Sequence, residues 1–239
     1  MAKDRQKLVI PDAELDKQIL QMTDHYTDEL FNLPKGGAKR VLYPVSRLVI
    51  DPERFLDDAN EPMATQGMGV VYAQTANGKT LRAKADIEER ARLINTYYQP
   101  HHKNLVAAVD SALAREGYCL IIDGHSFPEK PLPYETDQNP DRPDICIGTD
   151  AFHTTEYLAS EVGRIFEQAG FSLAFNRPFG GSIVPVKHYR ITPAVKSIMI
   201  EVKRKLYMDE ATGDKLSGFE NFRVRFQGCL QQIAQRFED

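Results

Sequence analysis

The residues best suited to chemistry are a histidine and a glutamate that lie far apart in the sequence. His125 follows the apolar run 118–122 in a segment Asp-Gly-His-Ser, and Glu201 stands inside the apolar run 197–202. An imidazole at the carboxyl edge of a sheet lies where open α/β folds place their ligands. A carboxylate in a buried strand is costly unless it is paired, binds a metal or lies at the strand's mouth. We therefore expect His125 and Glu201 to share one site.

This pair of residue types is typical of a mononuclear zinc hydrolase. Such a site needs about three protein ligands from histidine and carboxylate, an open position for water, and a separate carboxylate as general base. His125 fits one ligand, and Glu201 fits the base. Asp24 or His25, in the segment 23–31, could supply another ligand.

Each of these residues also has a structural interpretation. Asp24 is more often a solvated residue on a helix face, because aspartates are usually exposed. His125 could instead be hydrogen-bonded to Asp123, which in a metal site would support the ligand from behind. For Glu201 the alternative is a structural ion pair with a nearby cation of its own segment: Lys196, Lys203 or Arg204.

Other catalytic signatures are absent from the sequence. It holds neither a G-x-x-x-x-G-K-[ST] phosphate loop nor a G-x-S-x-G nucleophile elbow, so serine hydrolysis at Ser126 is disfavoured. His101 and His102 are adjacent, and on a helix adjacent side chains diverge by about 100°, so we do not expect them to bind one ion together.

Four further residues are candidates for contact with a substrate. A guanidinium offers a planar fork that pairs with a carboxylate, although an exposed arginine without such a role is the more common outcome for any one of them. Ser126 lies directly beside His125. The candidates are Arg47, Arg177, Arg190 and Ser126.

Length and composition favour one enzyme-sized unit. The 239 residues suffice for one substantial core, and we expect a single domain over residues 1–239. A net charge of −4 argues against a nucleic-acid partner. The three cysteines form no C-x-x-C pair and are odd in number, which is typical of a reducing cytoplasm. No apolar run is long enough for a membrane span, so we expect no membrane partner. The oligomeric state stays open.

Helical and strand-like segments alternate, which predicts an α/β fold. Pro100 separates two helical patterns and leaves two helices or one kinked helix as alternatives. A long proline-rich segment follows the strand that leads to His125. The predicted helices are 12–31, 86–98, 101–116, 154–169 and 218–237; the predicted strands are 41–43, 48–50, 70–72, 118–123, 145–147, 171–175 and 197–202; and the predicted loop is 124–144.

Seven segments, in order along nearly the whole chain, resemble the N-formylglutamate amidohydrolases, zinc-dependent relatives of the carboxypeptidase and aspartoacylase hydrolases. Each segment is modest alone, and the series is specific. The segments are 23–31 (TDHYTDELF), 46–55 (SRLVIDPERF), 97–102 (YYQPHH), 122–126 (IDGHS), 144–149 (DICIGT), 176–181 (NRPFGG) and 198–208 (IMIEVKRKLYM).

The resemblance implies a zinc-carboxypeptidase-like α/β fold with a mixed central sheet flanked by helices. It implies that Asp24 and His125 bind zinc and that Glu201 is the base toward the metal-bound water. The reaction implied is hydrolysis of the amide bond of an N-formyl or N-acyl amino acid such as N-formylglutamate. Arg47 would then grip the acidic small-molecule substrate.

The sequence departs from this family at its N-terminal side. The family carries a Pro-His-Ser-Gly segment upstream of the Thr-Asp motif, and its histidine binds zinc, whereas no histidine precedes Asp24 here. We therefore expect a domain that lacks this segment and its strand. Either the chain begins downstream of the family's usual start, or it is a variant with an incomplete site. The alternative function is a catalytically impaired relative that binds an acidic small molecule without turnover.

Overall fold

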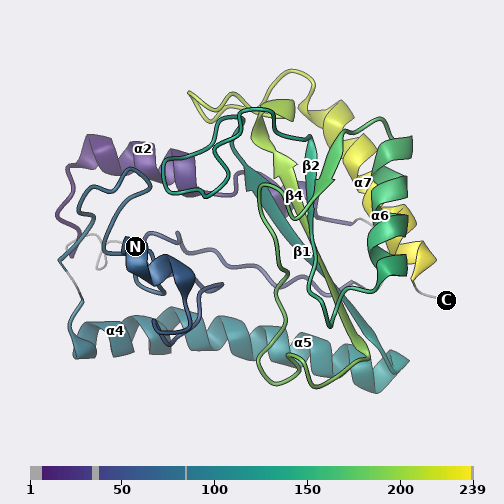
Figure 1. The fold of residues 1–239 in the computed structure, drawn as a ribbon, viewed down its shortest axis with the longest axis horizontal. Coiled ribbons are helices and arrows are strands. Elements are labelled where there is room, and N and C mark those ends of the chain that lie inside the picture. The colour runs from purple at the N-terminus through teal and green to yellow at the C-terminus, as the bar shows by residue number, and fades with distance from the viewer. Residues whose placement is uncertain (1–6, 34–37, 84, 238–239) are drawn as a thin grey trace. The chain divides into compact units, whose positions relative to one another are not determined.

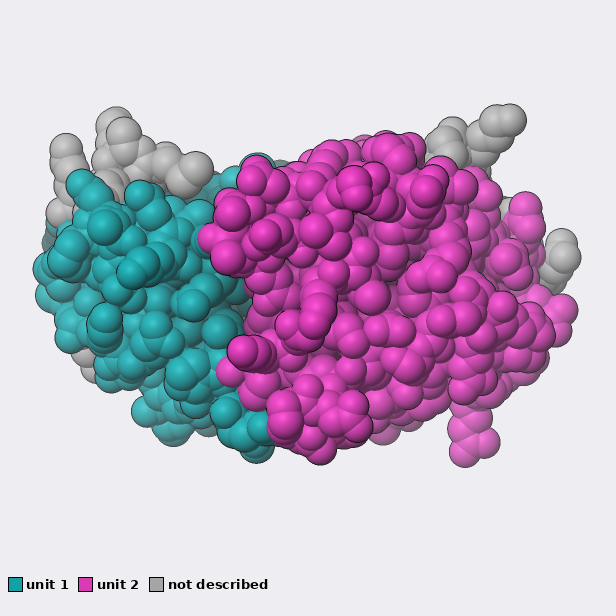
Figure 2. Space-filling model, turned by 90° about the horizontal axis from the view of Figure 1, so that it is seen from above, with its two compact units in different colours: residues 1–23, 41–105, 132–138 teal, residues 24–40, 106–131, 139–239 magenta. Residues whose placement is uncertain are grey.

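The computed structural model describes residues 7–33, 38–83 and 85–237. Its contacts divide the chain into two compact units, which Figure 2 shows in separate colours. Unit 1 comprises residues 1–23, 41–105 and 132–138, and unit 2 comprises residues 24–40, 106–131 and 139–239. The chain passes several times from one unit to the other, so neither is a continuous stretch of sequence.

Unit 2 holds a mixed four-stranded sheet, which confirms the α/β class expected from the sequence (Figure 1). The strand order is β1-β4-β2-β3, and β4 runs parallel to β1 and antiparallel to β2. β2 and β3 are parallel. Because β4 has a neighbour on both sides, its side chains are almost continuously buried. The strands are Cys119–Phe127 (β1), Ile145–Gly148 (β2), Leu173–Phe175 (β3) and Val195–Lys203 (β4).

Helices of unit 2 pack against this sheet and one another. α6 (Glu156–Gln168) contacts β2 and β3, and α7 (Phe219–Arg236) lies beside it (Figure 1). The Thr155 hydroxyl accepts a hydrogen bond from the Leu158 N–H and so caps α6. The core between these helices is built from aromatic rings in mutual contact: Phe166, Phe171, Tyr207, Phe222 and Phe226.

Unit 1 contains α2 (Asp12–Met22), α4 (Ile87–Leu93) and the first part of α5 (Gln99–Glu116). A π-helical turn, Ile94–Tyr98, joins α4 to α5, so the helix continues through Pro100. Proline lacks an N–H, and its ring would clash with the carbonyl one turn earlier in a regular α-helix. The wider π turn directly before Pro100 accommodates the ring, which resolves the alternatives left open by the sequence.

The predicted helix over residues 12–31 is interrupted in the structure. α2 ends at Met22, Thr23 is extended, and Tyr26 takes a left-handed conformation with φ 61° before the short helix α3 (Thr27–Leu30). The Thr23 N–H still donates to the Ile19 carbonyl, and the chain leaves the helix immediately after it, at Asp24 and His25. Helical periodicity persists on both sides of the break, which is why the sequence pattern does not show it.

Three predicted strands of unit 1 are wrong, because residues 41–43, 48–50 and 70–72 form turns and irregular segments. Their apolar side chains are nevertheless used, since Leu48, Ile50 and Val70 are fully buried. A short apolar run indicates burial and does not by itself specify pairing. Among the described residues, no helix is long and apolar enough to cross a membrane.

The strand predicted for residues 118–123 extends to Phe127. β1 pairs with β4 along its whole length, from Cys119 opposite Val195 to Phe127 opposite Lys203. His125 therefore lies within a strand and not in the loop after it. Pairing with a distant strand overrides the loop-forming tendency of the Asp-Gly pair at positions 123 and 124.

Candidate functional site

His125 and Glu201 are direct neighbours on adjacent strands. In the parallel pairing of β1 and β4, His125 lies opposite Glu201. Residues paired in this way project from the same face of the sheet, and neighbouring strands lie about 4.8 Å apart. Both residues are 8% exposed. The sheet therefore brings the predicted metal ligand and the predicted base together.

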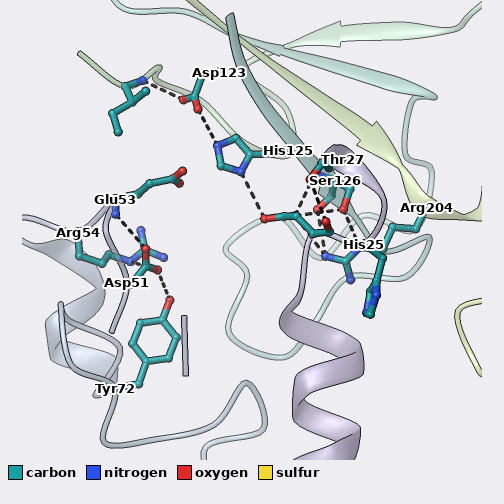
Figure 3. A network of polar contacts seen from close by, with 12 residues as sticks. His25, Thr27, Asp51, Glu53, Arg54, Tyr72, Asp123, His125, Ser126 and Arg204 are labelled. Carbon is teal, nitrogen blue, oxygen red and sulfur yellow. Dashed lines mark hydrogen bonds and ion pairs between the residues drawn. The ribbon is translucent and has the colours of Figure 1, made fainter. Parts of the chain in front are cut away.

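The imidazole of His125 lies between two carboxylates (Figure 3). Its Nε2 is 2.9 Å from Asp123 Oδ1, and its Nδ1 is 3.5 Å from Asp24 Oδ2. The other oxygen of Asp123 accepts a hydrogen bond from the Ile183 N–H at 2.9 Å. A carboxylate can only accept, so Nε2 donates to Asp123. In the neutral imidazole, Nδ1, the nitrogen that faces Asp24, then carries the lone pair.

The break between α2 and α3 delivers Asp24 to this position. The Thr27 hydroxyl, in the first residue of α3, donates to the Asp24 carbonyl at 2.9 Å. Asp24 Oδ1 accepts from both the backbone N–H and the hydroxyl of Ser126, at 3.0 and 3.1 Å. Arg204 Nη2 lies 3.6 Å from the same oxygen. Asp24 is thus a fixed carboxylate inside unit 2, not a solvated residue on a helix face.

The donor atoms of Asp24 and His125 fit a divalent ion. Zinc bonds of about 2.0–2.2 Å in a tetrahedron place neighbouring donor atoms roughly 3.3–3.5 Å apart. The 3.5 Å between Asp24 Oδ2 and His125 Nδ1 matches that spacing and is long for a hydrogen bond. Asp123 on the far nitrogen is placed like the carboxylate that orients a metal-binding histidine.

A glycine lets the loop that holds Asp123 approach the sheet. A Cβ atom added at Gly148, the last residue of β2, would collide with the Gly181 carbonyl and the Met199 side chain. Ile183, whose N–H donates to Asp123, follows two residues after Gly181. The Gly-Gly pair at 180 and 181 and the glycine of β2 therefore act together in positioning Asp123.

Two of the three cations expected beside Glu201, Lys203 and Arg204, have other partners. Lys203 pairs with Asp144 at 2.8 Å, and Arg204 pairs with Ser126 and Asp24. On its other side, β4 places Glu201 opposite Cys146. Burial, with a smaller contribution from the Glu201 carboxylate, raises the pKa of the Cys146 thiol to about 11. This thiol is therefore neutral near pH 7 and unsuited to nucleophilic attack.

The predicted substrate-binding arginines do not gather at one point of unit 2. Arg177 is half-buried and donates to the Asp141 carbonyl at 2.7 Å. Arg190 is exposed, and its guanidinium carbon lies 5.0 Å from the centre of the Tyr189 ring. Arg47 belongs to unit 1. Their contact with a substrate stays a prediction, as does that of Ser126, whose hydroxyl contacts Asp24 and Arg204.

Arg204 was not among the site residues expected from the sequence. It had been considered only as a partner of Glu201, because the two lie three residues apart. Ser126 lies opposite Val202, and Arg204 follows two residues later, after β4 has ended. The 3-10 turn Arg204–Leu206 brings the guanidinium to Ser126, a contact that strand periodicity in the sequence does not indicate.

Unit 1 holds a second buried carboxylate (Figure 3). Asp51 is 2% exposed, accepts from the Tyr72 hydroxyl at 2.5 Å and from the Glu53 N–H at 3.0 Å, and lies 3.5 Å from Arg54 Nε. Burial alone would raise the pKa of Asp51. The guanidinium groups of Arg47 and Arg54 outweigh burial and hold this pKa below its ordinary value.

Comparison with protein families assigns the chain. Residues 6–208 match the model of the N-formylglutamate amidohydrolase family, which is well over half of the chain. The chain belongs to this family. The match confirms the resemblance seen in the sequence, and Asp24, His125 and Glu201 all lie within the matched range.

Three individual proteins are similar to this chain. An N-formylglutamate deformylase of Pseudomonas aeruginosa is 26% identical over 202 residues, covering 82% of this chain and 74% of the relative. The crystal structure of an N-formylglutamate amidohydrolase from Ralstonia eutropha matches with a TM-score of 0.75 and 22% identity, covering 96% of this chain and 87% of the other. A gene product of Agrobacterium tumefaciens shares the fold more distantly, with a TM-score of 0.52, 17% identity and coverage of 80% and 66%.

Proposed function

We propose that this protein hydrolyses the amide bond of an N-formyl amino acid, with N-formylglutamate as the model substrate, and that it uses a zinc ion. The observation that carries the proposal is the proximity of three residues of unit 2 that are distant in sequence. Asp24 contacts His125, and His125 lies opposite Glu201 on the neighbouring strand. Family membership and the name of the Pseudomonas relative support the choice of substrate. We also propose that the α/β fold is of the zinc-carboxypeptidase type.

Asp24 and His125 would hold the metal through Oδ2 and Nδ1, which are 3.5 Å apart. When bound, zinc supplies a Lewis acid that lowers the pKa of water and polarises a carbonyl. Asp123 keeps the imidazole in the tautomer with its proton on Nε2 and so leaves Nδ1 as the donor atom.

Glu201 would act as the general base. Its carboxylate lies on the strand beside His125, where it can accept a proton from the attacking water and pass it to the leaving nitrogen. Water adds to the formyl carbon, and the C–N bond then breaks to give formate and the free amino group of the amino acid. The departing nitrogen takes up the proton that Glu201 carries. The acidic side chain of the substrate would pair with an arginine, with Arg47 as our first candidate.

The direct test measures formate release from N-formyl-L-glutamate with and without added zinc. We expect zinc-dependent turnover in the parent and turnover lower by about 10²–10⁴-fold in Glu201→Gln. Equal release by the parent and Glu201→Gln would remove Glu201 from the mechanism. N-acetyl-L-glutamate and N-formyl-L-leucine, assayed in parallel, separate the choice of acyl group from the choice of side chain.

A second candidate function is binding without turnover, and one observation favours it. Catalytic zinc sites use three protein ligands, whereas the proposed ligands that meet among the described residues are two, Asp24 and His125. This function predicts that N-formylglutamate raises the free energy of unfolding by about 2.7 kcal/mol at a hundredfold excess over Kd. The melting temperature should rise accordingly, with no formate released. Formate release at any zinc concentration excludes it.

A further inference from the structure

Arg204 is a buried cation at the edge of the proposed site. It is the first residue after β4, in the 3-10 turn Arg204–Leu206, and is 5% exposed. Its Nε donates to the Ser126 hydroxyl oxygen at 3.0 Å, and its Nη2 donates to the Ser126 carbonyl at 3.1 Å. Such a charge is costly to bury unless it is paired and hydrogen-bonded. Two of the contacts that stabilise it are thus with one residue, Ser126.

These contacts fix the direction of the Ser126 hydroxyl. An arginine only donates, so Ser126 Oγ must accept from Arg204 Nε. The hydroxyl carries a single hydrogen, and Asp24 Oδ1, which only accepts, lies 3.1 Å from Oγ. The hydrogen therefore points toward Asp24. Arg204 acts on Asp24 through this relay and, at 3.6 Å, through its own charge.

The relay makes the two oxygens of Asp24 different. Oδ1 accepts from the Ser126 N–H and hydroxyl and lies nearest to Arg204. Oδ2 is the oxygen that faces His125 Nδ1. If the carboxylate turned, the distance and direction between Oδ2 and Nδ1 would change, and with them the fit to a tetrahedral ion.

We propose that Arg204 is a positioning residue, which acts through Ser126 to select the Asp24 oxygen that faces His125. The inference rests on the proposed function, because Asp24 and His125 are the proposed metal ligands. Arg204 is assigned no contact with substrate or with the reacting atoms. Its guanidinium supplies two donors in a fixed fork, which a lysine ammonium cannot reproduce.

The first test uses crystal structures of the metal-free parent and of Arg204→Met. We expect the Asp24 carboxylate to turn in the variant, so that Oδ2 no longer faces His125 Nδ1. A carboxylate that keeps its orientation in Arg204→Met overturns the proposal. This measurement needs no bound metal and no activity.

The second test titrates zinc alone into the metal-free proteins by calorimetry, with melting temperatures measured in parallel. We expect Arg204→Met to bind zinc about 10–100-fold more weakly, as do changes to residues that orient metal ligands. Arg204→Lys should recover part of the loss. Ser126→Ala should weaken binding in the same way, and the double variant should lose less than the sum of the single losses, because both changes break one relay.

Lys205→Met is the matched control. It is the next residue, is exposed, and pairs with Glu129 at the surface, so it should leave zinc binding unchanged. A lower melting temperature in Arg204→Met with unchanged zinc affinity means that Arg204 is purely structural and overturns the proposal. If Arg204→Met does not fold, Arg204→Lys and Ser126→Ala decide it in both tests. A parent that binds no zinc refutes the metal in the proposed function, while the metal-free structures still decide the role of Arg204.

Discussion

Two aspartates, one buried in unit 1 and one half-buried in unit 2, lie beside arginines in different ways. Asp51 of unit 1 has both oxygens engaged, Oδ1 by the Glu53 N–H and Oδ2 by the Tyr72 hydroxyl and Arg54. Asp24 of unit 2 accepts on Oδ1 from the Ser126 N–H and hydroxyl, and its Oδ2 faces an imidazole nitrogen at 3.5 Å. The partners of Asp51 are thus those of a structural ion pair, whereas Asp24 pairs with a side chain that can itself bind a metal.

The surroundings of the two residues support this distinction. Asp51 lies among Tyr72, Tyr98 and the two arginines, and burial, with Asp51 contributing, raises the pKa of Tyr98 to about 12. These tyrosines therefore stay protonated and act as donors near pH 7. Asp24 instead lies beside His125, whose strand neighbour is Glu201. In unit 1 the charge of Asp51 is balanced by the arginines Arg47 and Arg54. In unit 2 the carboxylates of Asp24 and Asp123 flank the imidazole of His125.

The largest effect should come from Glu201→Gln, which removes the proposed base and keeps the shape of the side chain. We expect formate release to fall by about 10²–10⁴-fold, measured as kcat on N-formyl-L-glutamate, with zinc affinity retained. Lys205→Met, a change at an exposed residue next to Arg204, is the control and should keep the activity of the parent. Full activity in Glu201→Gln would contradict the proposal that Glu201, the strand neighbour of His125, is the general base.

The next effect separates the two aspartates. Asp51→Asn breaks a buried ion pair, so we expect a loss of about 3–5 kcal/mol in the free energy of unfolding, with zinc affinity of the folded fraction unchanged. Asp24→Asn should chiefly weaken zinc binding. Urea unfolding and zinc calorimetry on both variants measure the two outcomes. If the two variants gave the same pattern, the distinction between a structural and a ligating carboxylate would fail.

A smaller effect is expected at Asp123, which holds His125 without facing the proposed ion. Asp123→Asn keeps an acceptor for Nε2 but lowers its charge, so zinc affinity should fall by about 10–100-fold. Competition with a chelator of known affinity would measure it. The Ile183 N–H loses a charged acceptor as well, so the melting temperature of this variant should be recorded alongside. An affinity equal to the parent would mean that the Asp123 contact is not used to orient the imidazole.

The smallest effect is the dependence of stability on acid pH. The pKa of Asp51 is lowered in the folded protein, so its stabilising contribution is present above the unfolded value of about 3.9 and is lost as pH falls through the folded value. The stability difference between the parent and Asp51→Asn should therefore be constant near neutral pH and shrink below about pH 4. Urea midpoints at several pH values test this. A difference that grows on acidification would contradict the assigned sign.

Sequence patterns predicted the two strands that carry His125 and Glu201 more reliably than the local structure around them. Both runs were expected as buried strands that share a site; both strands form, and the structure adds that they are neighbours. The expected boundaries failed where a distant partner intervened. β1 continues through His125 because β4 pairs with it to the end, and the helix through Asp24 breaks because Ser126 and Arg204 hold that carboxylate.

By itself, the sequence determined the α/β class and the family, because apolar periodicity and the order of motifs are written along one chain. It also predicted Asp24, His125 and Glu201 as the residues that do the chemistry. Only the tertiary structure decided which atoms meet. Hydrogen bonds that orient Asp24 join residues about a hundred positions apart, and a linear pattern carries no information on which oxygen of a carboxylate is held and which is presented. That choice depends on the register of two strands and on one arginine after the second of them.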